Sequence, residues 1–169
     1  YFYRKQYNIP APTVAGDFKV LDIDSTEDFI NSAGFADNVI GDKFTLKNLE
    51  LKFQLNSDID DFRVVVYSPK RVGNQWQPGL TLPAITAPID PNIYSVLHDS
   101  YSNRSDNSSD RCLSRFVNLR NMTCIVNRDA SPDSLEKADV KIKVFYQADT
   151  KVSPAYIGQL QTQLCITDK

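Results

Sequence analysis

The stretch KFTLKNLELKFQL, residues 43–55, decides the fold class of this chain. Its second half alternates large apolar residues with polar ones, and the apolar residues are Leu49, Leu51, Phe53 and Leu55. A period of two is typical of a strand with one buried and one hydrated face. Phe44 and Leu46 lie in the opposite phase, which predicts a β-bulge or a sharp bend near Asn48.

A second stretch, FRVVVY over residues 62–67, is apolar at the three consecutive positions Val64, Val65 and Val66. Such a run indicates a strand that is covered on both faces. The polar residues 56–61 between the two stretches predict a turn or a short loop. A long bent strand that leads into a short buried strand favours a β-sandwich.

The rest of the chain adds further strand patterns. We expect strands at residues 18–23, 140–147 and 160–167, and one long strand or two segments of it at residues 115–119 and 122–126. Residues 93–98 are expected to form a short strand or a helical turn. Residues 140–147 alternate, which predicts one hydrated face. Residues 24–41 are expected to form a long loop with one helical turn near residues 26–30. Six or seven strands without a long helix predict an all-β, antiparallel β-sandwich.

Two segments between strands, one rich in proline and one rich in polar residues, are expected to be surface loops. Residues 68–91 contain five prolines and the single tryptophan, Trp76, and therefore cannot form a central strand. Residues 100–110 are rich in Ser, Asn and Asp, which is typical of a loop. We predict that Trp76, Pro78 and Tyr94 lie at a contact between subunits, because large aromatic residues are frequent interface anchors.

The first twelve residues combine aromatic side chains, two cations and two prolines. We interpret residues 1–12 as an N-terminal arm and residues 13–169 as one folded domain. Within the arm, Tyr3, Arg4 and Lys5 are candidate nucleic-acid-binding residues, because aromatic rings stack on bases and cations contact phosphates. The alternative is an arm whose aromatic residues pack against a neighbouring surface.

Composition limits the classes of function. The chain has 169 residues, of which 41% are hydrophobic and 24% charged, as is usual for one soluble globular domain. A net charge of −2 argues against nucleic-acid binding by the domain as a whole. No signal peptide or apolar run of membrane-spanning length is evident. Three cysteines cannot all pair within one chain, which favours a reducing compartment over a Cys112–Cys124 bridge.

The patterns of catalytic and metal sites are missing from the sequence. His98 is the single histidine, and its neighbours in sequence do not define a triad. Asp58, Asp60 and Asp61 could share a calcium ion, but a solvated turn is the simpler interpretation. Asn103, Asn107 and Asn121 each begin an N-glycosylation sequon, a match that arises by chance in such a polar chain. We expect a non-enzymatic protein without a metal or another cofactor.

The order of the segments resembles one particular family. Residues 41–51 (GDKFTLKNLEL), residues 62–67 before a proline-bearing loop, residues 115–123 (RFVNLRNMT) and the ending Ile166-Thr167-Asp168 resemble single jelly-roll capsid proteins. The likeness is to coat proteins of small circular single-stranded DNA viruses and of plant satellite viruses. It spans roughly residues 18–169. These coat proteins usually begin with an Arg/Lys-rich arm, and a jelly roll has eight strands, one more than we count here.

The resemblance implies a structural protein that assembles from identical subunits into a small, T=1-like icosahedral shell around a viral genome, with single-stranded DNA as the expected nucleic acid. Loops at residues 31–41, 68–91 and 100–110 would form its outer surface and its subunit contacts. It implies a location in the virion and, during assembly, inside the host cell, with the nucleus as one option. Because 19 Lys and Arg residues face 21 Asp and Glu residues, we also expect a basic arm upstream of Tyr1 to bind most of the genome.

Two other classes of function remain open from the sequence. One is a secreted carbohydrate-binding β-sandwich, with Trp76 and tyrosines as the platform for a sugar. The other is a trimeric receptor-binding head domain with the same fold. Neither predicts a membrane-spanning segment.

Overall fold

The computed structural model describes residues 1–11, 18–55, 59–73, 75–103, 111–148 and 156–168. Within them, eight long strands form the body of the molecule: β1 (Phe2–Pro10), β2 (Phe18–Ile23), β3 (Lys43–Leu55), β4 (Ile59–Pro69), β7 (Tyr94–Asn103), β8 (Arg111–Asn127), β10 (Lys141–Ala148) and β11 (Tyr156–Asp168). The shorter elements are α1 (Ser25–Ile30), α2 (Ala33–Asn38), β5 (Arg71–Val72), β6 (Gln75–Trp76) and β9 (Ser134–Lys137).

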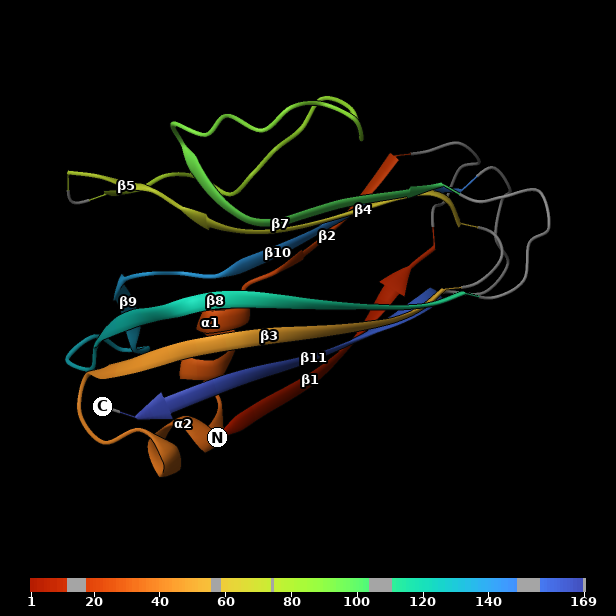
Figure 1. The fold of residues 1–169 in the computed structure, drawn as a ribbon. Helices are drawn as coiled ribbons and strands as arrows, with labels where there is room; N and C mark the ends of the chain where they lie inside the picture. Colours follow the sequence, from red (N-terminus) through yellow and green to blue (C-terminus); the bar gives the residue numbers. More distant parts are fainter. Residues whose placement is uncertain (12–17, 56–58, 74, 104–110, 149–155, 169) are drawn as a thin grey trace.

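Apart from β5 and β6, which pair with each other, the strands form two antiparallel sheets that face each other (Figure 1). The five-stranded sheet has the order β1-β11-β3-β8-β9, and the four-stranded sheet has the order β2-β10-β4-β7. Among the eight long strands, the first pairs with the last, the second with the seventh, the third with the sixth and the fourth with the fifth. A long hairpin rolled into two sheets gives this order, which defines a jelly roll. The predicted antiparallel β-sandwich is therefore confirmed.

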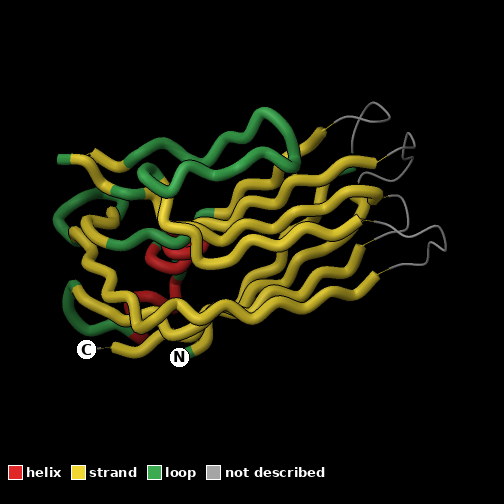
Figure 2. Tube along the Cα trace, turned by 45° about the horizontal axis from the view of Figure 1, so that its top comes forward, coloured by secondary structure: helices red, strands yellow, loops and turns green. Residues whose placement is uncertain are grey.

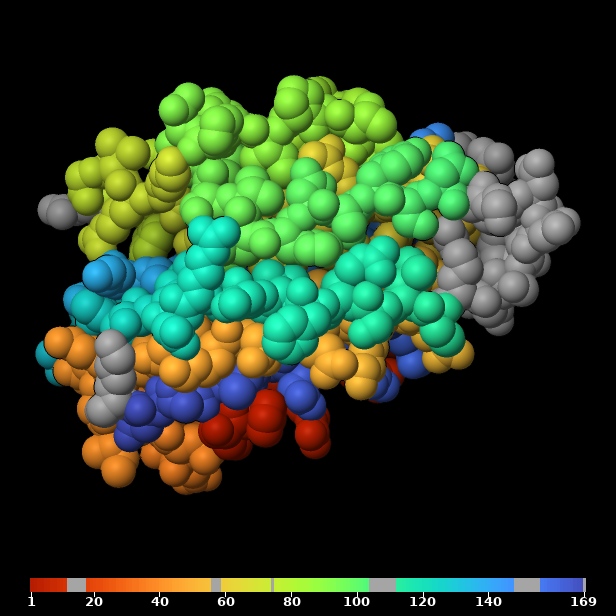
Figure 3. Space-filling view, viewed as in Figure 1, coloured from red at the N-terminus to blue at the C-terminus, as the bar shows by residue number. Residues whose placement is uncertain are grey.

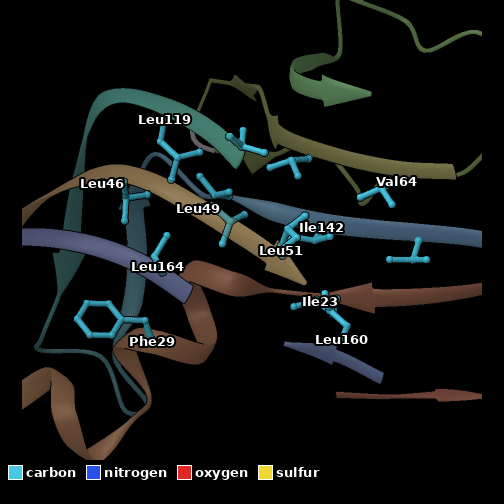
Figure 4. Packing of buried hydrophobic residues seen from close by; sticks show 14 of the residues in the cluster. Ile23, Phe29, Leu46, Leu49, Leu51, Val64, Leu119, Ile142, Leu160 and Leu164 are labelled. Carbon is cyan, nitrogen blue, oxygen red and sulfur yellow. The ribbon is translucent and has the colours of Figure 1, made fainter. Parts of the chain in front are cut away.

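Strand β3 follows its sequence pattern closely. The four alternating apolar residues of its second half are at most 2% exposed, whereas Lys52 and Gln54 between them are exposed. The pairing with β8 shifts between Leu46 and Asn48, which confirms the predicted bulge. The bulge lets Phe44 and Leu46 face the same core as Leu49 although their phase differs. Figure 4 shows Leu46, Leu49 and Leu51 among core side chains of both sheets.

The two central strands of the four-stranded sheet, β4 and β10, are buried on both of their faces. Val64 and Val66 of β4 belong to the core between the sheets, whereas Val65 packs in a second cluster on the outer side. That cluster contains Phe145 of β10 and apolar residues of the long β6–β7 connection, namely Leu80, Leu82, Ile85, Ile89 and Ile93. Figure 2 shows this connection running along the outside of the sheet. The prediction of a hydrated face for residues 140–147 is wrong, because the connection covers it.

The interpretation of residues 1–12 as an arm needs correction over most of its length. Phe2 to Pro10 form β1, which pairs with β11 along the whole strand and lies at the edge of the sheet. Half-buried and exposed residues alternate along β1, but apolar periodicity in the sequence does not reveal this. The inward-facing residues are Tyr3, Lys5, Tyr7 and Ile9, and of these only Ile9 is fully buried. β1 is also the eighth strand of the jelly roll that the sequence count lacked.

Two short helices close one end of the sandwich next to β1 (Figure 1). The expected helical turn near residues 26–30 is confirmed as α1, and α2 follows within the segment expected to be a loop. Phe29 of α1 packs edge-on against Phe35 of α2 and Phe44 of β3, with ring centroids 5.3 and 5.4 Å apart. None of the helices in the described part of the chain is long and apolar enough to cross a membrane.

Two further expectations concern the middle of the chain. The segment at residues 93–98 belongs to a strand, β7, which reaches into the expected loop as far as Asn103. Residues 115–126 form one long strand, β8, with an irregularity at Arg120 and Asn121, whose φ angles are 56° and 55°. The expected loop residues 104–110 and Asp58 lie outside the described residues.

Candidate nucleic-acid and assembly surfaces

The three residues predicted to bind nucleic acid point to different sides of β1. Tyr3 and Lys5 face α1 together with Tyr7, and all three contact Asp28. The Tyr3 hydroxyl donates to the Asp28 carbonyl oxygen (3.2 Å), Lys5 Nζ lies 2.9 Å from Asp28 Oδ1, and the Tyr7 hydroxyl donates to Oδ2 (2.5 Å). Burial and the bond to Asp28 raise the pKa of Tyr7. Tyr3 and Lys5 therefore hold β1 against α1.

Arg4 lies on the other side of the strand, where the outer face of the five-stranded sheet is open. Its Nε donates to Oε1 of Gln163 on β11 at 2.7 Å, and the Arg4 side chain is exposed. The strand registers place outward-facing residues of β1, β11, β3 and β8 in transverse rows. Figure 3 shows these four strands as successive bands of one surface.

Amide side chains dominate this surface, which we call the amide face. Three neighbouring rows define it: Arg4, Gln163, Glu50 and Phe116; Gln6, Gln161, Lys52 and Ser114; Asn8, Gln159, Gln54 and Cys112. A depression of about 480 Å³ lies over the first two rows and is lined by Arg4, Gln6, Gln163 and Lys52 among others. A second depression of about 300 Å³ adjoins it and shares Lys52 and Gln161. Together they form a groove across the strands.

On the opposite face of the molecule, the buried Arg63 holds the β6–β7 connection against the four-stranded sheet; we call these contacts the clamp. Arg63 on β4 is 7% exposed, and its Nη1 donates to the carbonyl oxygens of Ile85 (2.8 Å) and Ala87 (2.7 Å). Its Nε and Nη2 bind both carboxylate oxygens of Asp99 at 2.8 and 2.7 Å. These bonds raise the pKa of Arg63. One guanidinium thus fixes the connection to both β4 and β7.

The predicted subunit-contact residues lie in or beside the same connection. Trp76 is half-buried: its Nε1 donates to the Leu135 carbonyl oxygen at 3.2 Å, and the Arg71 guanidinium lies 5.7 Å from its ring centre. Pro78 is exposed. Tyr94 is only 9% exposed and packs edge-on against Tyr67, with ring centroids 5.5 Å apart. Trp76 and Pro78 therefore keep accessible surface, whereas Tyr94 is nearly buried within the chain.

His98 does not form part of a catalytic arrangement in the described residues. Its Nε2 lies 3.0 Å from Ser100 Oγ, but the carboxylate of Asp99 binds Arg63 instead of orienting the imidazole. Burial lowers the pKa of His98, and the nearby positive charge of Arg115 lowers it further. Within the ranges given above, no three His, Cys, Asp or Glu residues are placed to hold a metal ion.

A buried charged group, Asp139, lies two residues before strand β10. Asp139 is 6% exposed and lies 3.2 Å from Lys141, which also pairs with Asp24. Burial raises the pKa of Asp139, and Lys141 opposes that rise.

Cys112, Cys124 and Cys165 are all free thiols, so the Cys112–Cys124 bridge considered from the sequence is not formed.

The strand order and the two surfaces define a jelly-roll protein with one covered and one open sheet face. No protein-family model matches the chain, and no curated protein sequence matches it. Among solved structures, a chain from Desmodium yellow mottle tymovirus covers 98% of this chain and 85% of its own length, at 12% identity and a TM-score of 0.47. A chain from empty heads of turnip yellow mosaic virus covers 98% and 79%, at 9% identity and a TM-score of 0.46.

Proposed function

We propose that this protein is a capsid subunit that assembles, without catalysis, into a small T=1-like icosahedral shell around a viral genome. The carrying observation is the complete jelly-roll pairing of eight strands in a chain whose segments resemble coat proteins. The segments that carry the resemblance lie in β3, β4, β8 and β11, which belong to the body of the two sheets. A fold alone does not define a function, so this proposal needs a direct test.

Particle mass distinguishes the proposed shell from the two alternatives. Light scattering and negative-stain microscopy of the purified protein should show closed particles of megadalton mass. A stable monomer would contradict the proposal and favour a carbohydrate-binding sandwich, whereas a stable trimer would favour a receptor-binding head. The nucleic acid recovered from particles would decide between DNA, which the resemblance implies, and RNA.

We further propose that the β5–β6 hairpin contributes to subunit contacts. Val72 at its turn is 66% exposed, and Trp76 and Pro78 next to it retain accessible surface. A half-buried tryptophan on a hairpin that projects from the sandwich is a typical interface anchor. Trp76→Ala should leave the subunit folded by circular dichroism but reduce particle yield. Normal particle yield from the variant would remove Trp76 from the interface. Lys43→Gln, at an exposed position of β3 outside the segments assigned to subunit contacts, provides a control substitution.

A further inference from the structure

We propose that the amide face binds a short single-stranded segment of nucleic acid that runs across β1, β11, β3 and β8. The inference rests on the proposed function in one respect, namely that a genome is the natural ligand of a shell protein. It differs from the expected basic arm, because it assigns binding to the folded sheet. It also gives a role to Arg4, whose side chain lies on the side of β1 opposite to the contacts that Tyr3 and Lys5 make with Asp28.

The geometry of the face suits an extended polymer. Neighbouring strands lie about 4.8 Å apart, so a row across four strands spans about 14 Å. The groove follows these rows and lies over outward-facing side chains that are mostly exposed. Six of the twelve positions in the three rows are Gln or Asn residues. Each amide group offers donors and an acceptor in one side chain.

The chemistry of these side chains favours bases that are not paired. Amide groups can bind the hydrogen-bonding edges of bases when a single strand presents them unstacked. Phe116 lies at the end of the Arg4 row and is 67% exposed, which leaves its ring free to stack on a base. A duplex hides the pairing edges of its bases and offers no free base for Phe116. The face should therefore prefer single strands over duplexes.

Charge complementarity favours a nucleic acid over a neutral saccharide. Arg4 and Lys52 lie on the three rows with Glu50 as their one acidic residue, although the chain as a whole carries a charge of −2. Lys52 pairs with Glu50 at 3.3 Å, and its side chain is 61% exposed. An exposed pair of this kind is weak, so phosphate can replace Glu50 as the partner of Lys52. Three of the chain's other carboxylates are engaged away from the three rows: Asp28 with Lys5, Asp61 with Tyr101 and Asp99 with Arg63.

The binding experiment uses the full chain under reducing conditions and a fluorescent single-stranded oligonucleotide of about 12 residues. Fluorescence anisotropy should show binding that weakens with salt, with a slope of about −0.7 for each phosphate contact in a plot of log K against log salt. Arg4→Gln and Lys52→Gln should each reduce that slope by about 0.7. Phe116→Ala should weaken binding about tenfold with an unchanged slope. Lys70→Gln and Ile40→Ala, away from these rows, are the matched controls and should bind as the parent does.

Three results would overturn the inference. These are equal affinity for a duplex of the same sequence, unchanged binding by all three variants of the face, and displacement of the oligonucleotide by a neutral linear oligosaccharide. The last result would assign the face to a glycan. Particle assays keep this inference apart from the proposed function: the variants should form shells that contain less nucleic acid, measured by the ratio of absorbance at 260 and 280 nm. A parent chain that binds the oligonucleotide but forms no shells would contradict only the proposed function.

Discussion

The two sheets of this sandwich differ in what lies on their outer faces. The four-stranded sheet is covered by the β6–β7 connection, and the second apolar cluster fills the space between them. The five-stranded sheet is open, and six of the twelve outward positions in its three rows are amide residues, all of them in β1, β3 and β11. The strand sequences encode this difference. Buried and exposed residues alternate in β3 and β11, whereas β4 is apolar at consecutive positions. A covered face stabilises the folded chain, and an open face is available for binding.

The strongest test of this comparison removes a core side chain of the open sheet. Leu51 is fully buried between the sheets, so Leu51→Ala should lower the free energy of unfolding by about 2–5 kcal/mol. Its neighbour Lys52 points outward, and Lys52→Ala should cost less than about 0.5 kcal/mol. Urea denaturation of both variants measures the difference. Equal midpoints would mean that β3 does not have one buried and one open face.

A second prediction addresses the clamp on the covered sheet. Arg63→Ala removes four hydrogen bonds that join β4, β7 and the β6–β7 connection, and should cost about 2 kcal/mol, since Asp99 remains partly hydrated. The connection should also open locally, which hydrogen exchange at residues 80–93 would detect as faster exchange. The conservative Arg63→Lys keeps the charge but cannot make the same forked contacts. Unchanged exchange in both variants would show that the apolar cluster alone holds the connection.

A third prediction uses pH to loosen the covered face. Tyr67 lies beneath the connection and accepts a hydrogen bond from the Leu80 backbone N–H at 3.0 Å. Burial raises the pKa of Tyr67 from 10.0 to about 12. Because the folded-state pKa is the higher one, its contribution to stability is complete below pH 10 and is lost as the pH rises towards 12. Tyr67→Phe should flatten the loss of stability over that interval, whereas an identical pH profile would exclude Tyr67 as a cause. Tyr146, whose pKa burial also raises to about 12, provides a comparison on the core side.

The sequence predicts the elements in which one side chain pattern dominates. The bulge in β3, the buried run in β4 and the alternation in β11 are all confirmed, because apolar periodicity alone encodes them. The wrong prediction for β10 has a tertiary cause: Lys141 and Lys143 indicate a hydrated face only if nothing covers it, and the β6–β7 connection packs on Phe145 of the same strand. Lys143 is 7% exposed and lies 2.8 Å from Asp22, so even its charge is paired locally.

The site was harder to predict than the fold. The aromatic and basic composition of the N-terminal segment is enough to select Arg4 as a candidate. The side of β1 on which Arg4 lies, however, depends on pairing with a strand 159 residues away in the sequence. The amide face was missed entirely, because its residues come from four strands and form rows only in the folded sheet. One signal was present in the sequence: Gln159, Gln161 and Gln163 occupy three successive alternate positions of the last strand. Repeated amides on one strand face indicate more than solubility.

The smallest expected effect concerns this glutamine row and separates stability from binding. Gln161 is exposed at the middle of the amide face, between Gln6 and Lys52 in its row, whereas its neighbour Leu160 is fully buried. Gln161→Ala should change the free energy of unfolding by less than about 0.5 kcal/mol, because the side chain is exposed. The same substitution should weaken oligonucleotide binding, because it removes hydrogen-bonding groups from the centre of the groove. Thermal denaturation and anisotropy on one protein preparation measure both quantities. Loss of stability without loss of binding would contradict the role assigned to the amide face. The glutamine row would then support the fold, and the ligand would bind elsewhere.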